Sequence, residues 1–376
     1  MITDFPDLTI TNSVKGCVSK LDTDNSNPSR AFDRCSQCGL CMSVCPTYQR
    51  ERSETSGPRG RLALMRLIER EGGVDVDPEY LQSCLRCGLC EGACPTGVPY
   101  PDLIRRHINQ VAPRDTDAIW ESLKMVRKTS PDTVRDLTFK LMAEAVVAQN
   151  CTPEATALHR DGRKVIFIAG AISRVVAPGL VERAHLWLDD QGFEVFTRSE
   201  ADALCLPWLE NGLLQNARTL LKHVTDWWDD LGHCDVYVLD PSVRRGVSSR
   251  FLLGEFAPFA NAMKECFDGV DLPARPMKPI AIENSLTVHN NQLERLVGTP
   301  AEYHRVPERL RGAGGVPVVD ASSAVFLDQL IRDKSAWLIE MGIDVLLTTD
   351  PNALGRFPQA IHPIMWQFQS YTREQA

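Results

Sequence analysis

The sequence lacks the features of a membrane-spanning, exported or nucleic-acid-binding protein. No apolar run reaches the roughly 20 residues that a membrane-spanning helix needs. Residues 1–29 show no basic segment followed by an apolar one, so they predict an extended arm rather than a signal peptide. The formal net charge of −8 argues against nucleic acid as a partner, because phosphate binding needs clustered Lys and Arg. We therefore expect a cytoplasmic protein that meets a membrane, at its inner face, only peripherally through another subunit.

The sequence also lacks the glycine fingerprint of dinucleotide binding. No G-x-G-x-x-G follows any predicted strand, so neither a flavin nor a nicotinamide is expected on this chain. Without such a cofactor the chain should not oxidise a substrate by itself. We therefore predict no catalytic residue here.

Cysteine, by contrast, is abundant and unevenly placed. The chain has 13 cysteines, and five of them are scattered, at Cys17, Cys151, Cys205, Cys234 and Cys266. In a chain without an export signal, clustering of the others indicates metal binding rather than disulfide bonds. Those others fall in two short runs: Cys35, Cys38, Cys41 and Cys45, then Cys84, Cys87, Cys90 and Cys94.

Both runs have the spacing C-x2-C-x2-C-x3-C-P. This is the pattern of bacterial two-cluster ferredoxins, in which the fourth cysteine of each run ligates the other cluster. Structural zinc is the alternative, and it is disfavoured because zinc sites take C-x2-C pairs that supply two ligands at a time. The runs therefore predict two [4Fe–4S] clusters with crossed ligands. One set is Cys35, Cys38, Cys41 and Cys94, and the other is Cys84, Cys87, Cys90 and Cys45.

A predicted helix lies between the two runs and begins near Pro58, which suits a first helical turn. Two of its residues are candidate cofactor-binding residues: Arg59 or Arg61 beside a cluster would raise its reduction potential. The alternative is a packing helix with exposed arginines, and this reading is favoured because surface arginines are common.

The rest of the chain alternates strand-like and helix-like segments, which is typical of parallel sheets with helices on both faces. We expect an α-helical two-cluster ferredoxin domain followed by two related α/β halves with parallel, Rossmann-like sheets. Strands are predicted at 164–169, 193–197, 235–240, 278–282, 316–320 and 344–349, and helices at 116–128, 132–149, 179–191, 209–231 and 324–341. The expected domains are the extended arm (1–29), the ferredoxin domain (30–112), a helical connector (113–160) and two α/β domains (161–275 and 276–376).

The blocks CPTYQ, GPRGR and CPTGVPY, which lie within residues 30–106, resemble the iron–sulfur subunit of glycolate oxidase. They are less similar to the matching subunit of anaerobic glycerol-3-phosphate dehydrogenase. The resemblance implies two α/β domains with Cys-Cys-Gly blocks, as in heterodisulfide reductase. This sequence departs from that pattern: Cys205 lies beside the first block position, Val243 stands where a cysteine is expected, and residues 319–323 replace the second block. The α/β domains are thus degenerate, and their remaining cysteines cannot hold a third cluster.

The resemblance also implies a function. The chain would be a non-catalytic, electron-transfer subunit of a flavin-dependent 2-hydroxy-acid dehydrogenase that acts on a glycolate- or lactate-like substrate. FAD or FMN would lie on a partner flavoprotein, and the clusters would pass single electrons to a quinone, a cytochrome or a ferredoxin-type acceptor. Two alternatives stay open: an iron–sulfur scaffold or assembly subunit with structural clusters, and a thiol or heterodisulfide reductase-like subunit, which the missing cysteines disfavour.

Overall fold

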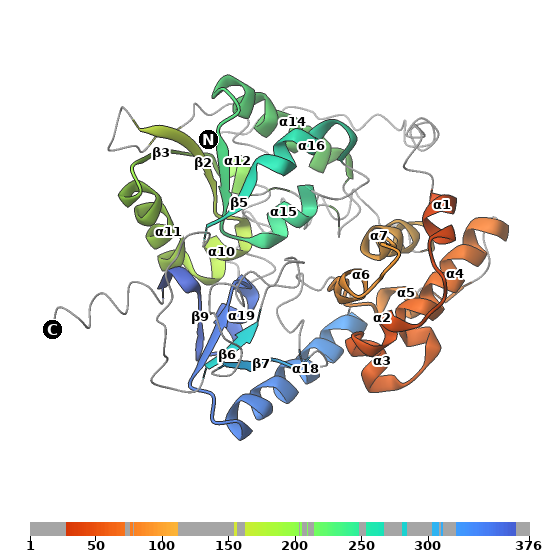
Figure 1. Cartoon of the computed structure of the whole chain (residues 1–376). Coiled ribbons are helices and arrows are strands. Elements are labelled where there is room, and N and C mark those ends of the chain that lie inside the picture. The colour runs from red at the N-terminus through yellow and green to blue at the C-terminus, as the bar shows by residue number, and fades with distance from the viewer. Residues whose placement is uncertain are drawn as a thin grey trace, which may run out of the picture.

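The computed structural model describes residues 28–71, 76–77, 79–111, 154–155, 162–202, 204, 209, 214–247, 253–266, 280–283, 303–307, 310 and 321–365. Several predictions lie outside these residues: the helices at 116–128 and 132–149, the strand at 316–320, and nearly all of the arm and of the connector. The described residues form an α-helical N-terminal part followed by two α/β halves (Figure 1). This confirms the predicted fold class.

The N-terminal part consists of short helices around a small apolar core. Its longest helix, α4 (Pro58–Glu71), starts with a proline, whose missing N–H would be unpaired at that position anyway. Leu62, Met65 and Ile68 recur at helical spacing along α4 and are buried. The other helices are α1 (Pro28–Asp33), α2 (Leu40–Ser43), α3 (Pro46–Glu51), η1 (Glu54–Ser56), α5 (Glu79–Gln82), α6 (Leu89–Gly92) and α7 (Tyr100–Val111).

The first α/β half holds a sheet with the strand order β1-β3-β2-β4-β5, in which only β1 pairs antiparallel. The central strand, β2, is apolar on both faces: Ile166 and Ile168 join the core beneath α14, while Val165 and Phe167 join the core beneath α11. A strand covered by helices on both sides in this way is typical of a parallel sheet. The strands are β1 (Glu154–Ala155), β2 (Arg163–Ile168), β3 (Phe193–Thr197), β4 (Asp235–Val238) and β5 (Met263–Glu265), and the helices are α10 (Ala171–Val176), α11 (Pro178–Asp190), α12 (Ser199–Asp202), α14 (Leu214–Asp230), α15 (Pro241–Val247) and α16 (Leu253–Ala262).

The second α/β half repeats this plan. Its sheet has the order β7-β6-β8-β9 and is parallel throughout, so its strands match β3, β2, β4 and β5 of the first half in order and direction. The strands β4 and β8 both lead into an Asp-Pro pair, and a helix starts at each proline. The elements are β6 (Ile280–Glu283), β7 (Tyr303–Arg305), α18 (Ala321–Glu340), β8 (Val345–Thr348), α19 (Pro351–Arg356) and β9 (Ala360–Ile361).

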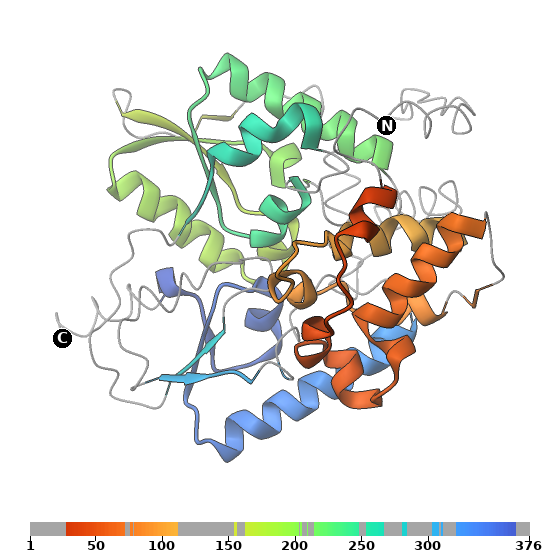
Figure 2. The ribbon, with the colours of Figure 1, turned by 45° about the vertical axis from the view of Figure 1, so that its right-hand side comes forward.

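The three parts are packed together. The helices that follow β2 and β8, α10 and α19, are in contact and join the two α/β halves. The N-terminal part lies against both halves, with the loop around α6 between them (Figure 2). Of the helices in the described ranges, none has the length and apolar character needed to cross a bilayer.

Candidate metal centre

The two cysteine runs fold into loops with the same backbone shape. The residue before the second cysteine of each run has a positive φ, 58° at Gln37 and 52° at Arg86. The residue after that cysteine also has one, 81° at Gly39 and 82° at Gly88. Glycine adopts such angles without steric strain. A short helix follows each glycine, α2 or α6, and carries the third cysteine of its run.

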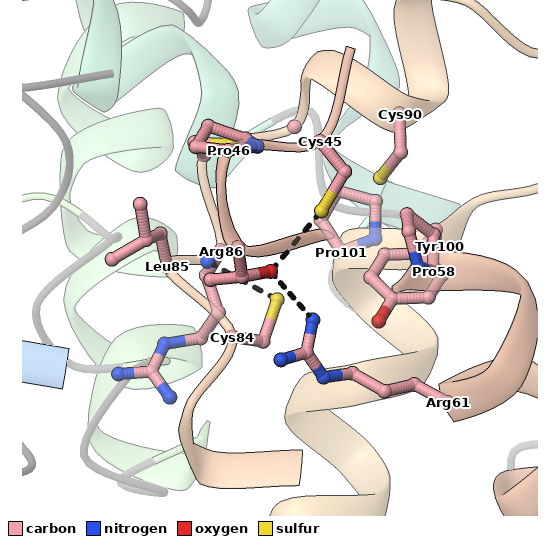
Figure 3. A pocket seen from close by; sticks show the side chains of 13 residues that line it. Cys45, Pro46, Pro58, Arg61, Cys84, Leu85, Arg86, Cys90, Tyr100 and Pro101 are labelled. Atoms are coloured by element: carbon pink, nitrogen blue, oxygen red, sulfur yellow. Dashed lines mark hydrogen bonds between the residues drawn. The ribbon is translucent and has the colours of Figure 1, made fainter. Parts of the chain in front are cut away.

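The first three cysteines of the second run line one cavity together with the last cysteine of the first run. Cys45 reaches this cavity because it is an extended residue just before α3, with Pro46 opening the helix. Figure 3 shows the side chains of Cys45, Cys84 and Cys90 around the same space, and Cys87 also lines it. All four are buried, with 8% or 9% of their surface exposed. They are the four cysteines of one predicted ligand set.

The other predicted set lies nearer the surface. Burial and then the charge of Cys35 raise the pKa of the Cys41 thiol to about 11, and Cys94 and Cys38 add to this effect. Cys94 of the second run is therefore a close neighbour of the first run. Cys38 is exposed, and the other three are half-buried.

Two thiols at the cavity, those of Cys87 and Cys90, strongly favour their protonated form. Burial raises the pKa of Cys87 to about 12 and that of Cys90 well above its ordinary value. At Cys90 the neighbouring Cys87, Cys84 and Cys45 raise the pKa further, because like charges disfavour each other. Such thiols lose their protons when iron binds, because the positively charged iron takes the place of the proton on the sulfur.

The donor set fits a [4Fe–4S] cluster. Cys45, Cys84, Cys87 and Cys90 surround a cavity that no other Cys, His, Asp or Glu lines. Four cysteine thiolates are the ligands that such a cluster takes. Across the described part of the chain, no group of three or more His, Cys, Asp or Glu side chains is placed to hold a single metal ion.

Arg61 lies between the two cysteine runs and is completely buried. Its Nε donates to the Tyr80 carbonyl (2.8 Å), Nη1 to Thr47 Oγ1 (3.1 Å) and Nη2 to Ser83 Oγ (2.9 Å). It lines the cavity, and its charge interacts with Cys84 and Cys45. Burying a charge is costly unless it is paired and hydrogen-bonded, so Arg61 is held here by these contacts.

Arg59 lies beside the first loop and is more exposed than Arg61. Its guanidinium pairs with Glu54, and Nη1 donates to the Gln37 carbonyl at 3.5 Å. A Cβ added to Gly39 would lie 2.9 Å from the same Nη1. The expectation of exposed arginines on this helix is therefore wrong for Arg61, which is completely buried, whereas Arg59 is partly exposed.

Three residues of the site carried no signal in the sequence. Thr47 Oγ1 lies 3.1 Å from Cys45 Sγ, and the Tyr100 ring lines the cavity and is buried. Arg245, in α15 of the first α/β half, donates from Nη1 to the Cys87 carbonyl at 2.9 Å. It stands 158 positions from Cys87, so only the folded chain brings the two together.

The remaining described cysteines lie apart from this site and from each other. Cys234 packs against the core on one face of the first sheet, and Cys266 belongs to the core on the other face. Cys205 lies outside the described residues. Near the strand ends of the first half, Asp202 accepts hydrogen bonds from the Ala169 and Gly170 N–H groups.

Comparison with known proteins agrees with this site. Residues 31–98 match the family model of the 4Fe-4S dicluster domain. The chain is 29% identical over 222 residues to the glycolate oxidase iron-sulfur subunit of Escherichia coli (strain K12), and the alignment covers 52% of each protein. The chain thus spans about half the length of this curated relative. No solved structure matches it significantly. The similarity read from the cysteine blocks is therefore confirmed: residues 31–98 match the 4Fe-4S dicluster domain, and the chain is similar to the glycolate oxidase iron–sulfur subunit.

Proposed function

We propose that this chain is an electron-transfer subunit that holds two [4Fe–4S] clusters and serves a flavin-dependent 2-hydroxy-acid dehydrogenase. The observation that carries the proposal is the cavity lined by Cys45 together with Cys84, Cys87 and Cys90. A cysteine of the first run reaches into the loop of the second run, as crossed ligation requires. The similarity to the glycolate oxidase iron-sulfur subunit supports a complex of this type.

In this proposal, each cluster takes up and releases one electron at a time. Cys45, Cys84, Cys87 and Cys90 hold the buried cluster, and Cys35, Cys38, Cys41 and Cys94 hold the other. Arg61 balances negative charge at the buried site and fixes its surroundings through three hydrogen bonds. No residue of this chain acts on substrate.

The two sites differ in access, which suggests how electrons enter and leave. Cys38 is exposed, whereas the buried set is enclosed between the N-terminal part and the α/β halves. A partner protein can therefore approach the first set more closely than the second. We assign electron exchange with a partner to the face around Cys38. The partner carries the FAD or FMN, and a quinone, a cytochrome or a ferredoxin-type protein is the final acceptor.

Anaerobic purification of the full chain tests this function. We expect about eight irons per chain and two clusters that are reduced reversibly, with interacting signals in electron paramagnetic resonance (EPR) spectra. Zinc in place of iron would contradict the metal assignment. Clusters that resist reversible reduction would instead indicate a structural scaffold. Co-purification of a flavoprotein that reduces the clusters when glycolate or lactate is added would identify the partner.

A further inference from the structure

A guanidinium group lies against the glycine of each cysteine loop. A Cβ added to Gly39 would lie 2.9 Å from Nη1 of Arg59, and one added to Gly88 would lie 2.3 Å from Nη2 of Arg245. Each glycine has a positive φ, which glycine adopts without strain, and the guanidinium occupies the space where a Cβ would lie. The two arginines have different origins, because Arg59 belongs to the N-terminal part and Arg245 to the first α/β half.

Arg245 is directed to the second loop by the fold of the first α/β half. Strand β4 ends at Val238 and helix α15 starts at Pro241, so the parallel sheet sets the position of the helix. Arg245 Nη1 then donates to the Cys87 carbonyl at 2.9 Å. The neighbouring arginine, Arg244, points elsewhere and forms an ion pair of 3.6 Å with Glu265. Only one of the two adjacent arginines therefore faces the cysteine loop.

The surroundings of this contact strengthen its electrostatic effect. The loop residues Leu85, Cys87 and Leu89 are buried in a core that they share with Leu346 and Phe357 of the second α/β half. Water is therefore largely excluded from one side of the loop, and charges interact more strongly where water is excluded. Arg59, by contrast, lies near the surface and is paired with Glu54.

We propose that Arg245 is a positioning residue that raises the reduction potential of the cluster held by Cys84, Cys87, Cys90 and Cys45. This inference rests on the proposed function. Reduction adds negative charge to a cluster, so a nearby positive charge stabilises the reduced form. The first α/β half thereby takes part in electron transfer although it holds none of the predicted cluster ligands.

The test is a redox titration of the intact, cluster-loaded chain followed by EPR spectroscopy. R245Q removes the charge and should shift one of the two midpoint potentials to a lower value. R244Q is the matched control, since it removes the same charge from the next residue of α15, and it should leave both potentials unchanged. R245K keeps the charge and should stay closer to the wild type than R245Q does. R59Q should move the other midpoint, by less, because solvent screens that site.

Each outcome decides the inference. Suppose that the wild type shows two midpoint potentials, and that R245Q at full iron content has the same potentials as R244Q. This result overturns the inference about Arg245 and leaves the proposed function intact. If R245Q loses half of its iron, R245K decides: eight irons and a near-native potential support a role of the charge, whereas equal loss in R245K overturns it, because the loop then needs the shape of arginine. A wild type without reducible clusters overturns the proposed function and this inference with it.

Discussion

Crossed ligation can be tested by removing the last cysteine of each run, with C45A and C94A. Each change removes one of the four thiolates of one site and leaves the other set of four intact. The iron content should therefore fall from about eight to about four per chain in both variants. The variants differ in the cluster that remains: C45A keeps the set that includes the exposed Cys38, and C94A keeps the buried set.

The assay is the rate at which a strong iron chelator removes the remaining iron under anaerobic conditions. We expect faster release from C45A, because Cys38 is exposed, whereas the cysteines that remain as ligands in C94A are only 8% or 9% exposed. Ligation within each run predicts the opposite order, since C45A would then keep the buried cluster. C234A is the control and should keep about eight irons. Slower release from C45A than from C94A would refute crossed ligation.

Three further changes test the surroundings of the clusters. R61M removes a buried charge that makes three hydrogen bonds, so the free energy of unfolding, measured in denaturant, should fall by about 3–5 kcal/mol. G88A places a side chain at a φ of 82° and should lower the iron content. G179A is the control and should leave the iron content unchanged, because its φ is not positive and no atom lies within 4 Å of its added Cβ. Burial raises the pKa of Asp240 to about 7, so the native state binds more protons than the unfolded state between the two pKa values. The wild type should therefore lose about 1 kcal/mol of stability between about pH 6 and pH 8, and D240N should lose less, as thermal unfolding at the two pH values would show.

The elements that could be predicted are those with a strong local pattern. The strand Phe193–Thr197 has the predicted bounds, and β2 differs by one residue at each end. Their apolar residues are continuous or alternate, and turns flank them, so the local sequence is sufficient to predict each strand. The two strand ends at Pro241 and Pro351 are equivalent, since each proline starts a helix after a central strand.

The elements that could not be predicted depend on distant partners. β5 (Met263–Glu265) and β7 (Tyr303–Arg305) are three-residue strands with charged members, and neither has an apolar pattern of its own. They are strands because they pair with the edges of β4 and β6. The predicted ligand sets come from spacing within each run, whereas the contact of Arg245 with Cys87 exists only after two sheets have formed around the loop.

The α/β halves explain why two loops of the same shape have different properties. Both loops share their cysteine spacing and the positions of their positive-φ residues, so neither ligand spacing nor backbone shape distinguishes them. What differs is the cover: the second loop is enclosed by a shared apolar core on one side and by Arg245 on the other, while the first is left at the surface. Cluster potentials depend on charge, hydrogen bonds and solvent exposure around the sulfur atoms. The α/β halves hold none of the predicted ligands, but they give two loops of the same shape different surroundings.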